Sequence, residues 1–536
     1  MILLQIRFNL LSFVKSKMFP FLFALFLIGC GGGGSSNSNP QVITDAQVPT
    51  ITSNPQNAAY TQNTVPSHLN VTATVDDGGN LSYQWYSNNV SLNDGGTLIN
   101  GETSDSFTPQ TNEIGTFYYY VVVTNTNNNA SGVKTANETS NVAEIVVNAP
   151  IVIEITNQAE LNAIRTNLSG NYILLNDIVL DGNSWLPIGN DTDPFTGVFN
   201  GNNHTIAGLY ININAIYAGL FGYLTGSVSD LGVEIATGGI YNHFNPPESP
   251  PIARGTTGGI AGYVNGGSIV NSYTIGNVTS SGSFAYAGGI AGVINNSSII
   301  NSYSNGNITS GEYAGGIAGV VIDGSVITGS YSTGNIKGRT IGGITGSVNI
   351  GNIIDSYFIG NVTTSSGFVF AGGITSAVNG GNVTNSYAIG NISTLVNPSY
   401  AFIGGIAGYV GDDIGGGWGS IIGSITNCVA ANQAISVNST NLFAKRVVGE
   451  IRTASVVINN FANSYMLINE SIVPESAENG KDKAIVELQD QNTYEDAING
   501  DGLGGLGWKF GDNDTHPWKI DASKNNGYPY LYWQEL

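Results

Sequence analysis

Short apolar stretches separated by glycine, asparagine and serine recur along most of this chain of 536 residues. From about residue 219 to residue 428, the phrase Gly-Gly-Ile is followed by Ser-Tyr and then by Gly-Asn in all copies but the last. The copies begin at Gly258, Gly288, Gly315, Gly342, Gly372 and Gly404, at intervals of 30, 27, 27, 30 and 32 residues. A fixed period in the range of roughly 20 to 50 residues predicts units that must stack, because one unit cannot bury its apolar side alone.

Each repeat contains three short β-prone runs, such as residues 259–264, 268–274 and 276–280. None has the length or the period of a helix, so three strands and three turns predict one coil of a parallel β-helix. Equivalent residues of neighbouring coils would then form ladders, which we interpret as core packing and turn support. The isoleucine ladder would contain Ile260, Ile290, Ile317, Ile344, Ile374 and Ile406. The tyrosine ladder would contain Tyr273, Tyr303, Tyr331, Tyr357 and Tyr387, with Cys428 taking the tyrosine place in the last coil. A third ladder would contain Asn271, Asn301, Asp355, Asn385 and Asn427, interrupted by Gly329.

The repeats also carry a family resemblance. The quartet Gly-Leu-Phe-Gly at 219–222 and the Gly-Gly-Ile copies resemble the GLUG-motif repeats of bacterial surface proteins, and residues 185–189 and 195–201 resemble the usual lead-in to such arrays. The resemblance covers about residues 155–428. It implies a right-handed, filamentous-haemagglutinin-like β-helix on secreted or surface-displayed proteins, many of them adhesin-like, with a peptidase domain in a few members.

Residues 48–150 follow a different pattern, with alternating strands at 69–75, 81–86, 115–125 and 142–147. Short alternating strands with frequent turns predict a β-sandwich. The phrases around Trp85 and Tyr119 resemble bacterial immunoglobulin-like domains, with Trp85 as the buried tryptophan. The usual cysteine pair is missing, and Tyr119 falls where the second cysteine would lie. We therefore expect Trp85 to pack on apolar neighbours only, and the domain to act as a spacer.

The first 29 residues combine basic residues with an apolar run at 18–28, as expected of an export signal. The sequence Leu-Ile-Gly-Cys at 27–30 resembles the lipobox of bacterial lipoproteins, which implies lipidation of Cys30. Residues 30–47 are rich in Gly, Ser and Asn and predict a flexible tether. Gly31 is not the Asp that commonly holds lipoproteins in the inner membrane. We therefore predict a lipid-anchored protein at the outer membrane or cell surface of a Gram-negative bacterium.

The charge restricts the partners. The formal net charge is −21, from 16 Lys and Arg against 37 Asp and Glu, and removal of the signal peptide with its three basic residues would make it −24. Such an acidic chain is repelled by phosphate backbones, so we expect no nucleic-acid partner. With Cys30 acylated, Cys428 would be the single remaining thiol.

Two segments outside the repeats are candidates for ligand binding. Residues 238–257 form the largest excursion from the repeat and contain His243 and Phe244, and excursions from solenoids often bind ligands. The aromatic segment at 471–536 predicts a C-terminal cap with Trp518, Tyr530 and Trp533 over the last coil. These aromatic residues could instead form a carbohydrate-stacking platform. At the other end, residues 157–164 predict a short helix over the first coil.

No constellation of catalytic residues stands out. The four histidines never approach zinc-peptidase spacing, and the carboxylates within the repeats form no recurring pair. Asp191 with Asp193, or Asp512 with Asp514, could hold calcium in a turn, although solvated turn acids are the simpler interpretation. We otherwise expect no cofactor and predict that the chain is not an enzyme.

The sequence therefore predicts an all-β protein: a signal peptide (1–29), a tether (30–47), an immunoglobulin-like sandwich (48–150), a β-helix with an N-terminal cap (151–470) and an aromatic C-terminal cap (471–536). The expected function is adhesive or structural, with the β-helix presented to a glycan or protein partner. Two alternatives remain, a β-helix enzyme that degrades or modifies polysaccharide and a carbohydrate-binding module.

Overall fold

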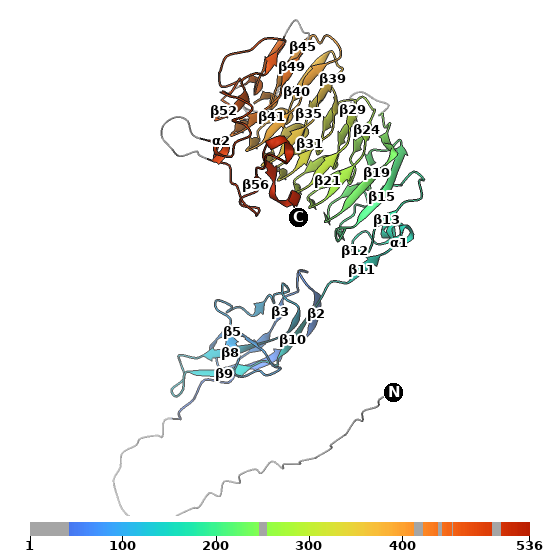
Figure 1. The fold of residues 1–536 in the computed structure, drawn as a ribbon. Helices are drawn as coiled ribbons and strands as arrows, with labels where there is room; N and C mark the ends of the chain where they lie inside the picture. The colour runs from blue at the N-terminus through green and yellow to red at the C-terminus, as the bar shows by residue number, and fades with distance from the viewer. Residues whose placement is uncertain are drawn as a thin grey trace, which may run out of the picture. The chain divides into compact units, whose positions relative to one another are not determined.

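The structure is a computed structural model that describes residues 42–245, 254–411, 422–437, 442–452, 454–495 and 505–535. It divides into two units, Met1–Ala149 and Pro150–Leu536, which are described separately (Figure 1). The signal peptide, Cys30 and most of the tether lie outside the described residues. Among the described residues, no helix is long and apolar enough to span a membrane.

The first unit is a β-sandwich. Its main sheet has the order β2 (Ala58–Thr61), β10 (Ala143–Asn148), β8 (Gly115–Thr126), β5 (Asn80–Asn88) and β6 (Thr97–Leu98), with β9 (Thr135–Thr139) also paired to β8. Strand β2 is parallel to β10, and the other pairs in this sheet are antiparallel. Two further pairs are β1 (Thr50–Ser53) with β4 (Thr72–Thr74), and β3 (Leu69–Asn70) with β7 (Ser106–Phe107).

An aromatic group replaces a disulfide in the core of the sandwich. Trp85 is fully buried, its ring centroid lies 5.5 Å from that of Phe107, and Phe107 lies 5.1 Å from Tyr119. The expectation that Trp85 packs on apolar neighbours only was wrong. Its indole N–H donates a hydrogen bond to the carbonyl of Ser104 at 2.9 Å. A buried indole needs such an acceptor to offset the loss of water.

The second unit begins with β11 (Val152–Ile155), helix α1 (Gln158–Ala163) and the 3-10 turn η1 (Ile164–Thr166). The predicted short helix is present, and Asn157 is its N-cap: the side chain accepts from the backbone N–H of Glu160 at 3.0 Å. The Glu160 carboxylate accepts in turn from the N–H of Thr156 at 2.7 Å. Leu161 and Ile164 are fully buried, so the apolar side of the turn covers the start of the solenoid.

The rest of this unit is a right-handed parallel β-helix. One representative coil consists of β26 (Ala291–Asn295), β27 (Ser298–Ile300), β28 (Tyr303–Asn305), β29 (Ile308–Ser310) and β30 (Tyr313–Gly315). Equivalent strands form parallel sheets that run along the helix axis (Figure 1). The sheets run from β11 to β52 (Val456–Ile458), from β13 (Ile178–Val179) to β55 (Lys481–Lys483), from β16 (Tyr217–Ala218) to β50 (Leu442–Lys445) and from β17 (Phe221–Leu224) to β51 (Val448–Ile451).

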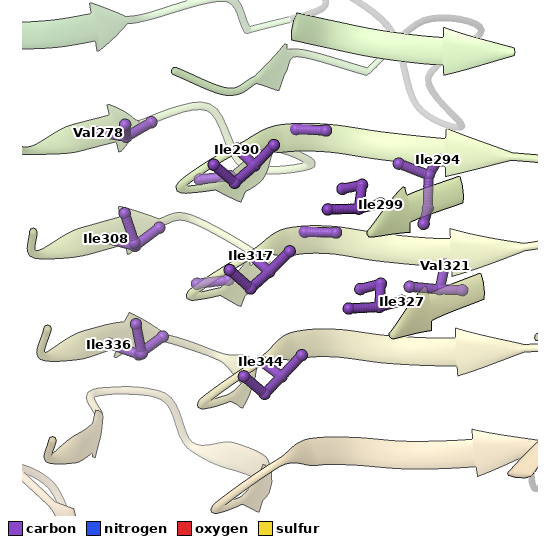
Figure 2. Packing of buried hydrophobic residues seen from close by; sticks show 14 of the residues in the cluster. Val278, Ile290, Ile294, Ile299, Ile308, Ile317, Val321, Ile327, Ile336 and Ile344 are labelled. Atoms are coloured by element: carbon purple, nitrogen blue, oxygen red, sulfur yellow. The ribbon is translucent and has the colours of Figure 1, made fainter. Parts of the chain in front are cut away.

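The isoleucine ladder is confirmed and fills the interior. All six isoleucines, from Ile260 to Ile406, have no exposed surface. Figure 2 shows Ile290, Ile317 and Ile344 above one another, with Val278, Ile308 and Ile336 as a parallel column. Because each side chain contacts its counterpart in the next coil, burial is shared between neighbouring coils.

The asparagine ladder marks a corner that requires a left-handed backbone. Its members have positive φ angles, for example 48° at Asn271, 50° at Asn385 and 57° at Asn427. Gly329 has φ of 57°, so it keeps the same conformation and does not break the corner. Asn, Asp and Gly tolerate this conformation better than other residues. Several side chains also bond between coils, such as Asn385 Nδ2 to Asp355 Oδ1 at 3.0 Å.

Cys428 does not take the tyrosine place. Val429 pairs in register with Tyr387, and Cys428 continues a buried column of serines. That column contains Ser272, Ser302, Ser330, Ser356 and Ser386. The backbone N–H of each of the first four donates to the serine hydroxyl of the next coil at 3.1 to 3.3 Å. Cysteine resembles serine in size and has a weak S–H donor, so it fits the interior column.

The aromatic C-terminal cap is present but lies elsewhere than over the last coil. The end of the solenoid is covered by β55, which pairs with β53 (Phe461–Asn463), and by fully buried Arg446, which is paired with Asp482. Helix α2 (Asn492–Glu495) follows. Residues 505–535, which we name the C-terminal strap, lie along the side of the β-helix and contain the hairpin of β56 (Trp518–Lys519) and β57 (Tyr530–Leu531).

Candidate functional site

The tyrosine ladder faces the strap and not the interior of the β-helix. Neighbouring rings from Tyr273 to Tyr387 are stacked, with centroids 4.8 to 5.0 Å apart. Side chains alternate along a strand, so the residue after each tyrosine points inward, as buried Thr274 does after Tyr273. The prediction that these tyrosines serve core packing is confirmed for Tyr357 and Tyr387, which are buried, although the core they belong to is not the solenoid interior. Tyr357 and Tyr387, with Tyr331 packed against them, form a second core together with the strap.

Three indole groups attach the strap to the corner of the β-helix. Trp508 donates to the carbonyl of Asn427 at 2.8 Å, Trp518 to Asp355 Oδ1 at 3.2 Å, and Trp533 to the carbonyl of Gly329 at 3.0 Å. Each acceptor belongs to the corner that sequence reasoning had assigned to the asparagine ladder. The strap therefore docks at defined coils, through hydrogen bonds that a purely apolar cover would not make.

The strap covers one part of the tyrosine ladder completely. Tyr387 donates to the carbonyl of Pro529 at 2.5 Å, and Tyr357 bonds to the amide of Gln534 at 3.1 Å. Both side chains are buried, and burial raises their pKa well above the ordinary value. Tyr273 and Tyr303 are only half-buried. The aromatic ladder thus continues beyond the covered part.

A groove of about 650 Å³ lies where the cover ends. Its volume is within the range of small-molecule and sugar sites. Its lining comes from four coils and from the strap: Asn203, Asp230, Leu231, Gly232, Val270, Asn271, Ser272, Tyr273, Ile300, Asn301, Tyr303, Asp514, Tyr532 and Trp533. We call it the strap-end groove.

Two carboxylates are held in fixed orientations in the strap-end groove. Asp230 Oδ1 accepts from the amide of Asn271 at 3.0 Å. Asp514 Oδ1 accepts from the amide of Asn301 at 3.2 Å and from the hydroxyl of Tyr532 at 2.5 Å. The hydrogen bond to Asp514 raises the pKa of Tyr532 to about 12, so this phenol remains protonated at neutral pH. The groove therefore offers hydrogen-bond acceptors beside aromatic surface.

The structure separates the predicted ligand-binding residues. Trp533 lines the groove, whereas Trp518 has no exposed surface and Tyr530 is buried, with its hydroxyl 2.6 Å from Glu535. His243 and Phe244 lie outside the groove lining, at the end of β19 (Gly232–Asn242), and the excursion at 246–253 lies outside the described residues. Their assignment to a ligand remains an untested prediction.

Sequence reasoning missed two contributors to the groove. Asp230 precedes Leu-Gly as Asn271 precedes Ser-Tyr, and it has the same left-handed conformation, with φ of 53°. Alignment of the first coils on the corner position would have placed it in the asparagine ladder. Asp514 had been considered only as a calcium ligand, and no local signal indicates that it lies beside Asn301.

Two of the four proposed calcium ligands, Asp512 and Asp514, have other partners. Asp512 pairs with Lys519 at 2.6 Å, and Asp514 bonds to Tyr532. Asp193 lies in an exposed turn, where its N–H donates to Asn190 Oδ1 at 2.9 Å. Within the described ranges, no group of three or more His, Cys, Asp or Glu side chains could hold a metal ion. Calcium binding remains a prediction.

Comparisons with known proteins assign no family to the chain and find a distant structural similarity. No family model matches it, so the GLUG and immunoglobulin-like resemblances remain resemblances. No curated protein matches it. Among solved structures, it is similar to an IgA1 protease with a TM-score of 0.33 and 14% sequence identity. The match covers 71% of this chain and 28% of that chain.

This comparison contradicts the prediction that the chain is not an enzyme, because the protein found is a protease by name. We withdraw that prediction. At this identity and TM-score, no activity of the protease is carried over to this chain.

Proposed function

We propose that this chain is an exported lipoprotein, anchored through Cys30 at the outer membrane or cell surface, whose β-helix binds a glycan or protein partner in an adhesin-like role. The lipobox-like sequence at 27–30 and the Gly-rich tether support the anchor. A stack of coils gives a long, stiff support for a binding surface.

The observation that carries the binding role is the strap-end groove. It joins half-buried aromatic residues to oriented carboxylates and amides, whereas the rest of the ladder is covered by the strap. A mostly apolar groove with a few convergent polar groups is the usual form of a ligand site. The partner therefore binds where the strap leaves the ladder open.

A second candidate function is cleavage of a glycan in the same groove. Glycoside hydrolysis commonly needs two carboxylates on either side of the scissile bond, and Asp230 and Asp514 both line the groove. Each is bonded to an asparagine of a different, neighbouring coil, and neighbouring coils are about 4.8 Å apart. Release of product from a bound oligosaccharide would select this function over binding alone.

The full-length chain should be produced with its own N-terminus in a Gram-negative host. We expect labelling by radioactive palmitate and digestion by protease added to whole cells, with both lost in Cys30→Ser. Unchanged labelling in Cys30→Ser would contradict the anchor. Binding of the same cells to glycan and protein surfaces should fall in groove variants, and binding that is unaffected by all of them would contradict the binding role.

A further inference from the structure

The ring of Trp533 lies close to the tyrosine ladder and lines the strap-end groove. Its plane lies within 27° of the planes of Tyr303 and Tyr331, with centroids 6.1 and 5.6 Å away. These two tyrosines already have ring neighbours in the stack, so Trp533 must lie beside the ladder. Trp533 lines the strap-end groove together with Tyr273 and Tyr303, so part of its ring surface is open to a ligand there.

A ligand with a flat ring could stack on the ring of Trp533 and lie beside the edge of the Tyr273 ring. Tyr273 itself offers an edge, because one face stacks on Tyr303 at 4.9 Å and the other lies over Gly232. A side chain added at Gly232 would approach the Tyr273 ring to 2.5 Å, so glycine is needed for this packing. A sugar ring has an apolar C–H face and a hydroxyl-bearing edge, which match an aromatic surface bordered by polar groups.

The polar groups of the groove match hydroxyl groups. One oxygen of Asp230 and one of Asp514 are held by neighbouring donors. The second oxygen of each carboxylate makes no hydrogen bond within the described residues and can accept from a ligand. The side-chain amides of Asn271 and Asn301 both donate and accept. A hydroxyl group does the same, whereas a guanidinium or ammonium group only donates and would leave amide N–H groups unmatched.

The charge of the groove excludes an anionic ligand. Its lining contains Asp230 and Asp514 and no lysine, arginine or histidine. The nearby strap cations are engaged elsewhere: Lys519 with Asp512 and Glu535, and Lys524 with Glu535. A uronic acid or a sulfated sugar would therefore meet two like charges with no counter-charge.

We propose that the strap-end groove binds an uncharged oligosaccharide, with one sugar ring stacked on Trp533 and its hydroxyl groups bonded to Asp230 and Asp514. The inference rests on the proposed binding function and adds the class of ligand and the residues that select it. The carboxylates accept charge-assisted hydrogen bonds, which are stronger than neutral ones. Their fixed orientation lowers the cost of ordering the site on binding.

The test is binding of the mature chain to an array of neutral, uronic-acid-containing and sulfated oligosaccharides of matched length, together with an arginine-rich peptide. We expect neutral oligosaccharides to bind and the acidic ones not to bind. Asp230→Asn and Asp514→Asn keep the size of the side chain and an acceptor for the existing donors, and each should weaken neutral binding about tenfold, the effect of losing a charge-assisted hydrogen bond. Tyr273→Ala should weaken it by a similar factor.

Matched controls separate the groove from general effects. Asp193→Asn removes an exposed carboxylate from a turn outside the groove, and Tyr400→Ala removes a partly exposed ring on a different sheet. Both should bind as the unchanged chain does. Trp533→Ala should abolish binding, and tryptic cleavage at Lys519 and Lys524 would show whether the strap remains docked in that variant.

Each contrary result has a definite meaning. Equal or tighter binding of acidic sugars, tighter binding of the peptide, or stronger binding by the two Asp→Asn variants would overturn the uncharged-glycan assignment. If a protein surface binds and only groove variants lose it, the proposed binding function stands and this inference fails. If no groove variant changes any binding, both fail.

Discussion

Truncation of Trp518 to alanine should release the strap without unfolding the β-helix. Trp518 is fully buried, its ring centroid lies 4.5 Å from that of Trp508, and its N–H bonds to Asp355 at 3.2 Å. Replacement of a buried aromatic residue by alanine costs about 3 to 5 kcal/mol. The strap is one segment docked on the side of a solenoid, so we expect this cost to act on docking of the strap.

If the free energy of strap docking falls by about 4 kcal/mol, the fraction of molecules with an undocked strap rises several hundredfold, since about 1.4 kcal/mol is a factor of ten. Trp518→Phe retains an apolar ring and loses the hydrogen bond to a carboxylate, so it should cost about 2 kcal/mol, or roughly thirtyfold. The two variants form a graded series with the unchanged chain.

Limited trypsin digestion can measure the fraction of molecules with an undocked strap, because the rate of slow cleavage follows the equilibrium between the docked and the undocked segment. The strap contains Lys509, Lys519 and Lys524 as cleavage sites. Cleavage there should accelerate in the order unchanged, Trp518→Phe, Trp518→Ala, while the far-ultraviolet circular dichroism of the β-helix stays the same. Tyr465→Ala, which removes a mostly exposed ring outside the strap, serves as the control.

Cleavage of Trp518→Ala within threefold of the control would refute the reasoning, since it would mean that the buried indole does not hold the strap. Simultaneous loss of the β-sheet signal would also refute it, because strap and solenoid would then unfold as one unit.

Three further predictions concern the ladders. Burial raises the pKa of Asp355, although hydrogen bonds from Asn385 and Trp518 oppose this shift. The ionised carboxylate therefore destabilises the fold at neutral pH, and this loss of stability disappears as the pH falls below the ordinary pKa of an aspartate. Asp355→Asn should therefore raise the thermal midpoint at pH 7 and lose this advantage near pH ~4; a lower midpoint at pH 7 would contradict it. Asn385, with φ of 50°, should tolerate glycine better than alanine by about 1 to 2 kcal/mol in urea unfolding, and equal stabilities would argue against a conformational role for this corner. Burial raises the pKa of Cys428 to about 12, so a thiol reagent should react with it only after denaturation, and Cys428→Ser should fold; rapid labelling of the native chain would disprove the burial.

The interior of the β-helix could be predicted from the sequence because the pattern that forms it is local and is repeated in every coil. Isoleucine recurs at one place in every unit, and a side chain at a constant place in a stack meets its own counterpart. The corner could also be predicted, since Asn and Gly share a tolerance for positive φ. Gly329 looks like an interruption when side chains are compared, but it is equivalent in backbone conformation. The N-cap at Asn157 depends on neighbours only three residues away.

The strap and its groove depend on contacts that no local pattern carries. Trp533 lies beside Tyr303 because the chain returns along the solenoid, and the composition of the segment indicates only that it covers something. The placement of Cys428 failed for a different reason. In the earlier coils the tyrosine lies two residues after the corner position, whereas Cys428 directly follows Asn427. The assignment was therefore shifted by one residue, which exchanges the inner and outer faces of a strand.

The indole hydrogen bonds of the strap also fix the number of coils that lie beneath it. Their acceptors at Gly329, Asp355 and Asn427 lie in different coils of the stack. A whole coil inserted between Gly329 and Asn427 would preserve every ladder, yet it would displace one indole from its acceptor by about 4.8 Å, far beyond a hydrogen bond. Asp514 of the strap also accepts from Asn301, one coil before Gly329, so the strap spans the coils from Asn301 to Asn427. An array that gains or loses units by duplication therefore keeps every strap contact only if the change lies outside these coils, and the number of units under the strap is fixed by the strap itself.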